Sequence, residues 1–542
     1  MWKVSSGRRC IFLQAVVVLL GVAAGYSQVP AAPINLQDDQ PVYLRFFGSS
    51  NADLFTRELD ESFQGVLGKS FVATAGNGFP AGFVNASLPG FPWAGTMWTR
   101  DAGAFMRELV MRGYYQHASL MAECLMGLVE KDPDGYYSFP RFFKGTQPGS
   151  GSELDGTASI VIGMELLWER LPDGNQTKNH VRDFLLQQAS PLNSIAFRLQ
   201  TEPLLSGSGE FGCGWTVPGE CDNVVQNNLS RLALLATSRM AEEAGRGTLA
   251  AEYSKLAAQI SDGMEKYLVD RDGSWIWCID HKSLLPNPEV LNAAPNRGTG
   301  ILNSVVSMDA DVLGFLPSTP QWEGIEHSRK TFLRLYDTAL RKTEFDRYGI
   351  WTQFDAVAAG MLSSPSYGQG YAIQTMLLFD DPAMADKALS WLASATFRPI
   401  PEYELHRASP YYFYERMYPP DAVGKVKLEE GCGALNLVNV AEPLKVSRLI
   451  LGVDDSAPDF VQIVPRVPPS WKGVEARNWP IRTRTGIVRA DILYQSNGSG
   501  ATITLKIAQG ERIDDLKVRM PSRSGFLWRE EKNARSVRFV TH

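Results

Sequence analysis

A long series of amphipathic helical segments, interrupted by one that is apolar on nearly every side, most constrains the fold of this 542-residue chain. Between residues 51 and 451 apolar residues recur with the period of a helix. One such stripe consists of Leu249, Tyr253, Leu256, Ile260, Met264 and Tyr267. The segment 158–168 is apolar almost all round, which is typical of a helix buried on every side. Alternation of the two kinds predicts a mainly α-helical, closed toroid of helical hairpins, and the lack of a fixed-period repeat disfavours an open solenoid.

The character of the sequence changes after about residue 452. Short β-branched segments with partial two-residue alternation follow one another and are separated by turn residues such as those at 497–500. These segments are 460–464, 486–494, 501–507 and 537–540. The pattern predicts a small C-terminal antiparallel β-sandwich over residues 452–542, after a helical part over residues 28–451.

The N-terminus has the pattern of a secretory signal peptide. Lys3, Arg8 and Arg9 precede the apolar run 11–24, and small residues follow it. The alternative is an uncleaved membrane anchor, but the run is shorter than the roughly 20 residues that a span needs. We therefore expect residues 1–27 to be removed and the protein to be exported to the periplasm or the extracellular space, without membrane attachment.

Charge and cysteine usage narrow the function classes. Lys and Arg number 53 against 59 Asp and Glu, a net charge of -6, which argues against nucleic acid as a partner. No Cys or His spacing typical of a metal site occurs, and no phosphate loop or dinucleotide-binding glycine pattern, so we expect neither a metal nor a cofactor. Cys213 and Cys221 are close enough in sequence to form a disulfide in an oxidising compartment.

Acidic residues and aromatic residues gather in five predicted loops between the helices, at 91–103, 151–157, 209–223, 399–406 and 429–433. An aromatic ring can stack on the apolar face of a sugar, and Arg and Asp match the hydrogen-bonding groups of its vicinal hydroxyls. Cleavage of a glycosidic bond requires two carboxyl groups, one as the acid and one as the base or nucleophile. The alternative for any single acid is helix capping, and for Asp309 and Asp311 capping is the interpretation that we favour.

The segment Met97–Gly103 resembles the Trp-x-Arg-Asp motif of glucoamylase-type glycoside hydrolases, the six-hairpin or (α/α)6-barrel glycosidases. The resemblance implies that Arg100 and Asp101 hold hydroxyls of the sugar in the −1 subsite and that Trp98 lines it. Weaker similarities cover most of the mature chain, at 154–158, 227–236, 401–402 and 459–471. The other substrate contacts that we predict are Trp93, Asp155, Trp215 and Glu430.

The catalytic carboxyl pair is predicted from the same resemblance. The tandem Trp-Glu-Glu that surrounds the family's general acid is absent here, so either Glu220 or Glu210 could be the acid, and we prefer Glu220 from its distance to the following helix. We prefer Glu402 over Glu430 as the base. The family typically inverts the anomeric configuration, and in that case the two carboxyl groups lie about 6.5–9.5 Å apart.

These features together predict an exported, exo-acting glycoside hydrolase whose partner is an oligosaccharide or polysaccharide. Two alternatives stay open. A phosphorylase on the same scaffold would need a basic phosphate pocket in place of the base. A non-catalytic glycan-binding protein would have kept the toroid without the carboxyl pair.

Overall fold

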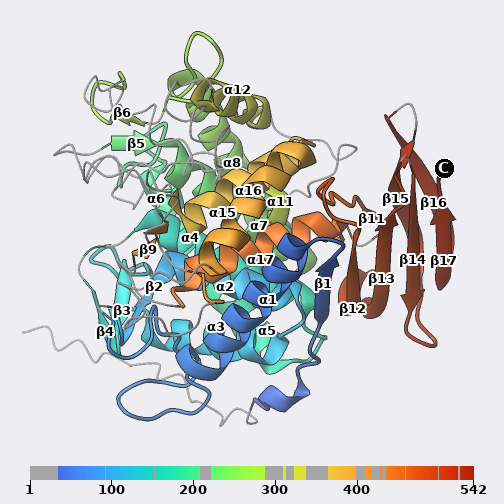
Figure 1. The fold of residues 1–542 in the computed structure, drawn as a ribbon. Coiled ribbons are helices and arrows are strands. Elements are labelled where there is room, and N and C mark those ends of the chain that lie inside the picture. The colour runs from blue at the N-terminus through green and yellow to red at the C-terminus, as the bar shows by residue number, and fades with distance from the viewer. Residues whose placement is uncertain are drawn as a thin grey trace, which may run out of the picture. The chain divides into compact units, whose positions relative to one another are not determined.

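The computed structural model describes most of the chain after residue 33 (Figure 1). The described residues are 34–91, 93–149, 151, 153–207, 221–276, 278–286, 309–312, 323–336, 364–397, 411–413, 416–417, 428–429, 435–457, 459–498, 500–522 and 525–542. Helix is the main secondary structure over these residues, and antiparallel sheets accompany it, as the sequence predicts. The predicted signal peptide, residues 1–27, lies outside the described residues.

The helices form consecutive packed pairs. They are α1 (Ser50–Gly65), α2 (Thr99–Met111), α3 (Tyr115–Leu128), α4 (Leu154–Arg170), α5 (Gln176–Leu186), α6 (Pro191–Arg198), α7 (Val224–Glu243), α8 (Gly247–Tyr267), α11 (Asp309–Val312), α12 (Gly324–Tyr336), α15 (Ser366–Leu378), α16 (Pro382–Phe397) and α17 (Leu437–Leu451). In the pairs α2–α3, α4–α5, α7–α8 and α15–α16, each helix packs on the next. The predicted helical hairpins are thus present.

Five inner helices form the core of the helical part. α15 packs on α17, α17 on α2, α2 on α4, and α4 on α7. Every residue of α4 from Leu154 to Trp168 is buried, which confirms the prediction from the apolar segment 158–168. α8 instead buries one face, including Tyr253 and Ile260 of the predicted stripe, because it covers the outside of α7.

The strands belong to two groups. Short strands precede inner helices: β2 (Thr96–Trp98), β3 (Phe142–Lys144), β4 (Gln147–Pro148), β5 (Cys221–Asn223), β6 (Cys278–Asp280), β7 (Ser364–Pro365), β8 (Arg416–Met417) and β9 (Leu428–Glu429). Longer strands dominate the second group: β1 (Tyr43–Phe47), β10 (Val453–Asp454), β11 (Val461–Ile463), β12 (Gly473–Thr483), β13 (Gly486–Ser496), β14 (Ala501–Ile507), β15 (Ile513–Ser522), β16 (Gly525–Ala534) and β17 (Ser536–Val540).

The second group forms two sheets, one in the order β1-β12-β13-β14-β17 and one in the order β10-β11-β15-β16. The strands predicted near 460, 486, 501 and 537 are confirmed as β11, β13, β14 and β17. Two features differ from a purely C-terminal antiparallel module. β1 lies close to the N-terminus and pairs with β12, with Phe46 opposite Val474, and β11 pairs with β15 in parallel.

The C-terminal ends of the inner helices contact these two sheets. Arg170, the last residue of α4, donates hydrogen bonds of 2.8 and 2.6 Å to the carboxylate of Asp455. The guanidinium of Arg112, at the end of α2, lies 5.7 Å from the ring centroid of Trp479 in β12. α17 continues through Gly452 directly into β10. The ends of three inner helices thus lie at the β-sheet part.

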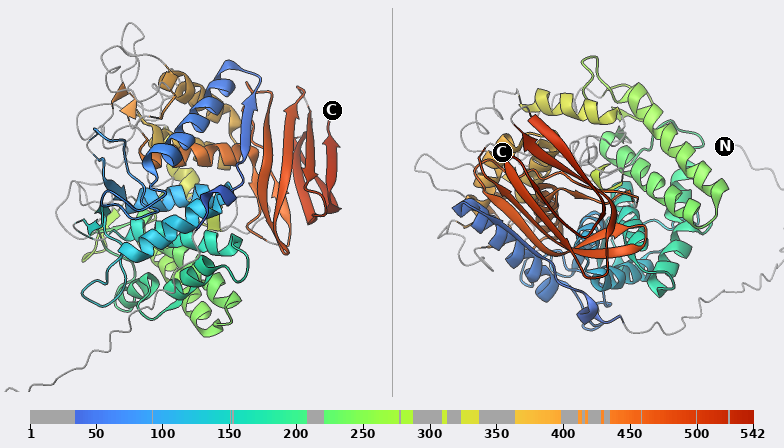
Figure 2. Two further views of the ribbon diagram at one scale, coloured as in Figure 1. Left: turned by 90° about the horizontal axis from the view of Figure 1, so that it is seen from below. Right: turned by 90° about the vertical axis from the view of Figure 1, so that its right-hand side faces the viewer.

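The other two inner helices end at the same side. Glu243 in the last turn of α7 lies 3.9 Å from Arg482 of β12, and Asp380, just after α15, lies 2.6 Å from Arg519 of β15. The five inner helices therefore run in the same direction, with their N-terminal ends away from the two sheets. Figure 1 and the left view of Figure 2 show the two sheets beyond one end of the helices, and in Figure 1 β2–β6 and β9 lie toward the other.

Cys221 and Cys278 are disulfide-bonded, whereas Cys124 is a buried free thiol. The predicted partner of Cys221, Cys213, lies outside the described residues, so that pairing stays a prediction. Among the described residues, no helix is both long enough and apolar enough to span a membrane.

Candidate active site

The turn from β2 into α2 fixes the first predicted motif. β2 pairs with β3, and Trp98 is opposite Phe142. The hydroxyl of Thr99 donates to the carbonyl oxygens of Pro140 at 2.8 Å and Arg141 at 3.1 Å. The backbone N–H of Thr99 also donates to the carbonyl oxygen of Arg141, at 3.2 Å. These bonds hold the start of α2 against the loop before β3, and they fix the direction in which the next two residues of the helix project.

Two glycines let α4 begin in direct contact with α2. A Cβ on Gly156 would lie 2.5 Å from Oγ1 of Thr99, and a Cβ on Gly103 would lie 2.4 Å from the backbone carbon of Ser159. Real Cβ atoms do not approach other atoms so closely, so both positions require glycine as the helices now pack. The side chain of Asp155, immediately before Gly156, is thereby held beside the start of α2.

Charged side chains converge where the two helices begin. Nη2 of Arg100 donates to Oδ1 of Asp101 at 3.2 Å, and Nη1 lies 3.8 Å from Glu153 and 3.9 Å from Asp155. Nε of Arg141 lies 3.0 Å from Oε1 of Glu153. The side chains of Arg100 and the three carboxylates are all less than a tenth exposed. We call these five residues the Arg100 cluster. Its negative carboxylates sit at helix N-termini, where the helix dipole favours negative charge.

Aromatic rings border the Arg100 cluster. The ring of Trp98 lies 5.1 Å from that of Trp93 at 77°, and 5.1 Å from that of Phe142 at 55°. The guanidinium of Arg141 lies 5.1 Å from the centroid of Trp98 and so joins the rings to the charged groups. Both tryptophans are partly exposed. Partly exposed rings beside fixed hydrogen-bonding groups are an arrangement that suits a sugar, which has apolar C–H faces and polar hydroxyls.

A second acidic group lies where α7 begins. Asp222, in β5, is fully buried, and its Oδ1 lies 2.8 Å from Nδ1 of His281. Nε2 of His281 lies 3.3 Å from Glu202. Burial raises the pKa of Asp222, although the hydrogen bond from His281 opposes the rise. β5 also pairs with β6, so this group is held firmly at the same end of the helices as the Arg100 cluster.

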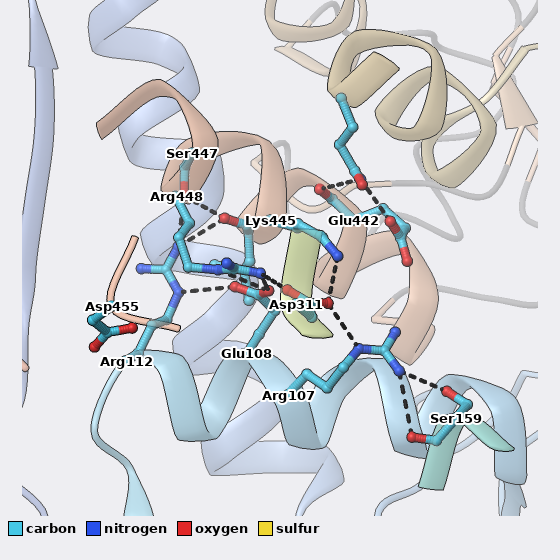
Figure 3. Close-up of polar contacts among 12 residues, drawn as sticks. Arg107, Glu108, Arg112, Ser159, Asp311, Glu442, Lys445, Ser447, Arg448 and Asp455 are labelled. Carbon is cyan, nitrogen blue, oxygen red and sulfur yellow. Dashed lines mark hydrogen bonds and ion pairs between the residues drawn. The ribbon is translucent and has the colours of Figure 1, made fainter. Parts of the chain in front are cut away.

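A buried ionic network lies among the inner helices (Figure 3). Asp311 of α11 accepts a hydrogen bond of 2.6 Å from Arg448, lies 3.3 Å from Arg107, and is also paired with Lys445. Arg448 further donates to Glu108 at 2.9 Å. Burial alone would raise the pKa of Asp311, but the three cations lower it to about 2. The capping role that we favoured for Asp311 from the sequence is therefore wrong.

Two other buried acids among the inner helices have raised pKa values. Burial raises the pKa of Glu442 to about 7, even though Lys445 and a 2.6 Å hydrogen bond from Gln374 oppose the rise. Burial and the neighbouring Glu169 raise the pKa of Glu165 to about 8, against the effect of Arg239. These acids lie well along α17 and α4 from the helix starts, and we assign them to the core.

The structure brings together the predicted residues Trp93, Trp98, Arg100, Asp101 and Asp155. The other predicted site residues, Trp215, Glu220, Glu402 and Glu430, and the alternative acid Glu210, lie outside the described residues. Their roles therefore stay predictions.

Sequence reasoning did not select Arg141, Glu153, Asp222 or His281. Glu153 and Asp222 lie in two of the acidic loops, so proximity to a helix start was the signal that could have identified them. Within the described residues, no group of three or more His, Cys, Asp or Glu side chains is arranged to hold a metal ion.

No protein-family model matches the sequence, and no curated protein is similar to it in sequence. Solved structures are similar in fold. The α-L-rhamnosidase from Dictyoglumus thermophilum superimposes over 93% of this chain and 50% of its own, with a TM-score of 0.57 and 11% identity. A GH78-family rhamnosidase from Bacillus sp. GL1 superimposes over 88% of this chain and 42% of its own, with a TM-score of 0.55 and 13% identity.

A shorter protein gives a similar result. The glucoamylase from Saccharomycopsis fibuligera superimposes over 74% of this chain and 96% of its own, with a TM-score of 0.52 and 13% identity. The present chain spans about half the length of the two rhamnosidases or less. The fold of the chain is therefore similar to the folds of these two rhamnosidases and this glucoamylase, as its resemblance to the glucoamylase-type enzymes implied.

Proposed function

We propose that the chain is an exported glycoside hydrolase that removes sugars from the ends of oligosaccharides or polysaccharides with inversion of the anomeric configuration. The observation that carries the proposal is the Arg100 cluster, which lies beside partly exposed tryptophans at the common N-terminal end of parallel inner helices. Two members of the cluster, Arg100 and Asp101, belong together with the neighbouring Trp98 to the motif that resembles a sugar-binding motif. The activities of the structural neighbours, rhamnosidase and glucoamylase, agree with this substrate class.

The finer fold belongs to the same proposal. We propose an (α/α)6 barrel over residues 28–451, in which α2, α4, α7, α15 and α17 are inner helices and α11 contributes to the sixth. Residues 452–542, with β1, would form a β-sandwich at the closed end of the barrel. The contact of α11 with α7 and the central place of Asp311 support this assignment of α11.

We further propose that Glu220 is the general acid and Glu402 the general base. Glu220 is covalently joined to Cys221, at the start of β5, and β5 leads into the N-terminus of α7. α16 begins near the β-sheet part, where Asp386 accepts a 2.8 Å hydrogen bond from Ser470, and runs toward the opposite end before the chain reaches Glu402. The positions of the two acids in the sequence, directly before β5 and five residues after the end of α16, support the assignment of these roles.

In this mechanism the acid protonates the glycosidic oxygen while the base activates a water molecule on the other face of the sugar. Arg100 would donate to hydroxyls of the terminal sugar, and Asp101 and Asp155 would accept from them. Trp98 and Trp93 would pack against its C–H face, and Trp215 would extend this wall. Burial of the carboxylates in the Arg100 cluster would keep the hydrogen bonds out of competition with water.

The disulfide-bonded Cys221 and Cys278 support export to the periplasm or the extracellular space, because disulfides persist mainly in oxidising compartments. The charge of the Arg100 cluster disfavours a phosphorylase. Its three carboxylates outnumber its two guanidiniums, so it lacks the positive excess that a phosphate pocket needs.

The test begins with the chain from residue 28, expressed with its disulfides, and a panel of aryl glycosides and disaccharides. On the substrate that is cleaved, NMR identifies the first anomer formed, which we expect to be inverted. Glu220→Gln and Glu402→Gln should each lower turnover by at least about 1,000-fold and leave substrate binding intact. Glu210→Gln and Glu430→Gln are the matched controls for acid and base.

Each outcome has a distinct meaning. Loss of turnover in Glu210→Gln or Glu430→Gln instead would transfer the acid or base role to that residue. Dependence of cleavage on inorganic phosphate would establish the phosphorylase. A folded chain that binds glycans and cleaves none of them would be the non-catalytic protein.

A further inference from the structure

We propose that the outer face of β16 is a second carbohydrate-binding surface, which holds a polysaccharide chain at a distance from the active site. The surface consists of Phe526 and Trp528, together with the side chains of β15 that support them, and we call it the β16 platform. The proposal rests on the proposed function in one respect only, namely that the ligand is a carbohydrate.

The two rings are exposed on one side of the same strand. Phe526 is 58% exposed and Trp528 is 38% exposed, in a protein whose other large apolar side chains are mostly buried. They occupy alternate positions of β16, and alternate residues of a strand project to the same face. Leu527 between them projects to the other face and packs against the core. The exposed pair is thus not the accidental end of a buried cluster.

The platform is held in place by Arg519 of the neighbouring strand, on the same face of the sheet. The guanidinium of Arg519 lies 4.3 Å from the ring centroid of Phe526, and Arg519 is opposite Trp528 in the β15–β16 ladder. Arg519 itself is buried and donates two hydrogen bonds, of 2.6 and 2.7 Å, to Asp380 after α15. A ring stacked on an immobilised guanidinium loses little side-chain entropy when a ligand covers its free face.

Polar groups surround the rings on the same face. Lys517 of β15 lies 3.6 Å from Glu530 of β16, and Lys532 is paired with Asp515. All four of these side chains are partly or largely exposed. Flat apolar rings bordered by exposed donors and acceptors match a sugar chain, whose units alternate apolar C–H faces with hydroxyl edges.

The dimensions and charge of the platform favour a sugar over a protein partner. A stable protein interface buries about 800 Å² on each side, far more than two aromatic side chains can offer. Edge-to-edge pairing of β16 with a second copy is opposed by the charged run Arg529–Lys532, since such charges protect edge strands from pairing. A polysaccharide needs only a few stacked rings, and gains strength by engaging the catalytic barrel at the same time.

The experiment measures binding and hydrolysis separately. The chain from residue 28 is mixed at 4 °C with insoluble starch, cellulose, mannan and xylan, and the bound fraction is measured by depletion from solution. For any polysaccharide that the wild type binds, Trp528→Ala should weaken the binding by at least about tenfold, and so should the double variant that also carries Phe526→Ala. Their kcat/KM on a small soluble aryl glycoside should equal that of the wild type.

Tyr43→Ala is the matched control, because Tyr43 is also exposed, at 43%, and lies 5.2 Å from Arg477 on the other sheet. It should leave binding unchanged. The proposal is overturned if the wild type binds none of the four polysaccharides, if Trp528→Ala binds as well as the wild type, or if that variant changes the oligomeric state in light scattering. Binding that Trp528→Ala weakens, with no hydrolysis of any glycoside by the wild type, would instead contradict the proposed function and support the platform.

Discussion

The buried carboxyl of Glu442 gives a prediction with a definite sign and size. Glu442 of α17 is buried, and Gln374 of α15 donates a 2.6 Å hydrogen bond to it. Burial raises its pKa from an ordinary 4.5 to about 7. The folded protein therefore keeps this proton up to about pH 7, whereas the unfolded chain releases it near pH 4.5.

The raised pKa of Glu442 makes the free energy of unfolding depend on pH, because proton binding and folding are linked. Because the folded state binds the proton more tightly, the free energy of unfolding falls as pH rises through the window from about 4.5 to about 7, and it stays lower above that. At about 1.4 kcal/mol for each pH unit, this interval corresponds to an upper limit of about 3 kcal/mol. Glu442→Gln keeps an oxygen that accepts from Gln374 and has no proton to release, so it removes this loss.

Denaturant unfolding of the wild type and Glu442→Gln at pH 4 and pH 8.5 tests the reasoning. We expect the stability of the variant relative to the wild type to be higher at pH 8.5 than at pH 4 by up to about 3 kcal/mol. Glu61→Gln, which changes an exposed carboxylate on α1, is the matched control and should show no such gain. A relative stability of Glu442→Gln that is the same at both pH values, or lower at pH 8.5, would refute the assignment.

Asp311→Asn should lower the free energy of unfolding by about 3–5 kcal/mol, because it leaves buried cations without their shared anion; a loss below 1 kcal/mol in denaturant unfolding would contradict its central place. Gly103→Ala should cost about 1–3 kcal/mol and lower kcat/KM, because the new Cβ meets the backbone of Ser159. Its control, Gly127→Ala in α3, meets nothing within 4 Å and should be neutral or stabilising, so equal melting temperatures for the two variants would rule out the packing argument. Cys278→Ser should cost about 2–5 kcal/mol, and a thiol titration of the denatured wild type that finds Cys278 free would disprove its disulfide.

The sequence predicted those parts of the fold that depend on local pattern. The segment 158–168 is apolar on nearly every side, which is typical of a helix buried all round, and α4 is buried in this way. The stripe through Tyr253 and Ile260 leaves one polar face, and α8 covers α7 with the apolar face. The short β-branched segments after residue 452 were predictable as strands because two-residue alternation is also a property of neighbouring residues.

Features that depend on distant residues were not predictable in this way. The partners of Asp311 are at positions 107, 445 and 448, so nothing in its own neighbourhood distinguishes it from a capping residue. β1 pairs with β12, more than 400 residues further along the chain, and a five-residue strand carries no signal of its partner. Glu153 looks like a residue at a helix start, and only the packing of α4 on α2 brings it to Arg100 and Arg141.

Kinetics of Arg100→Met on the glycoside cleaved by the wild type test the central claim most directly, with Arg57→Met, an exposed arginine on α1, as the control. If the Arg100 cluster holds the reacting sugar, loss of the charge-assisted hydrogen bonds that Arg100 would donate to it should lower kcat/KM by about 100-fold or more, and the control should match the wild type. A folded Arg100→Met variant with the kcat/KM of the wild type, or a folded wild type that cleaves no glycoside at all, would contradict the account.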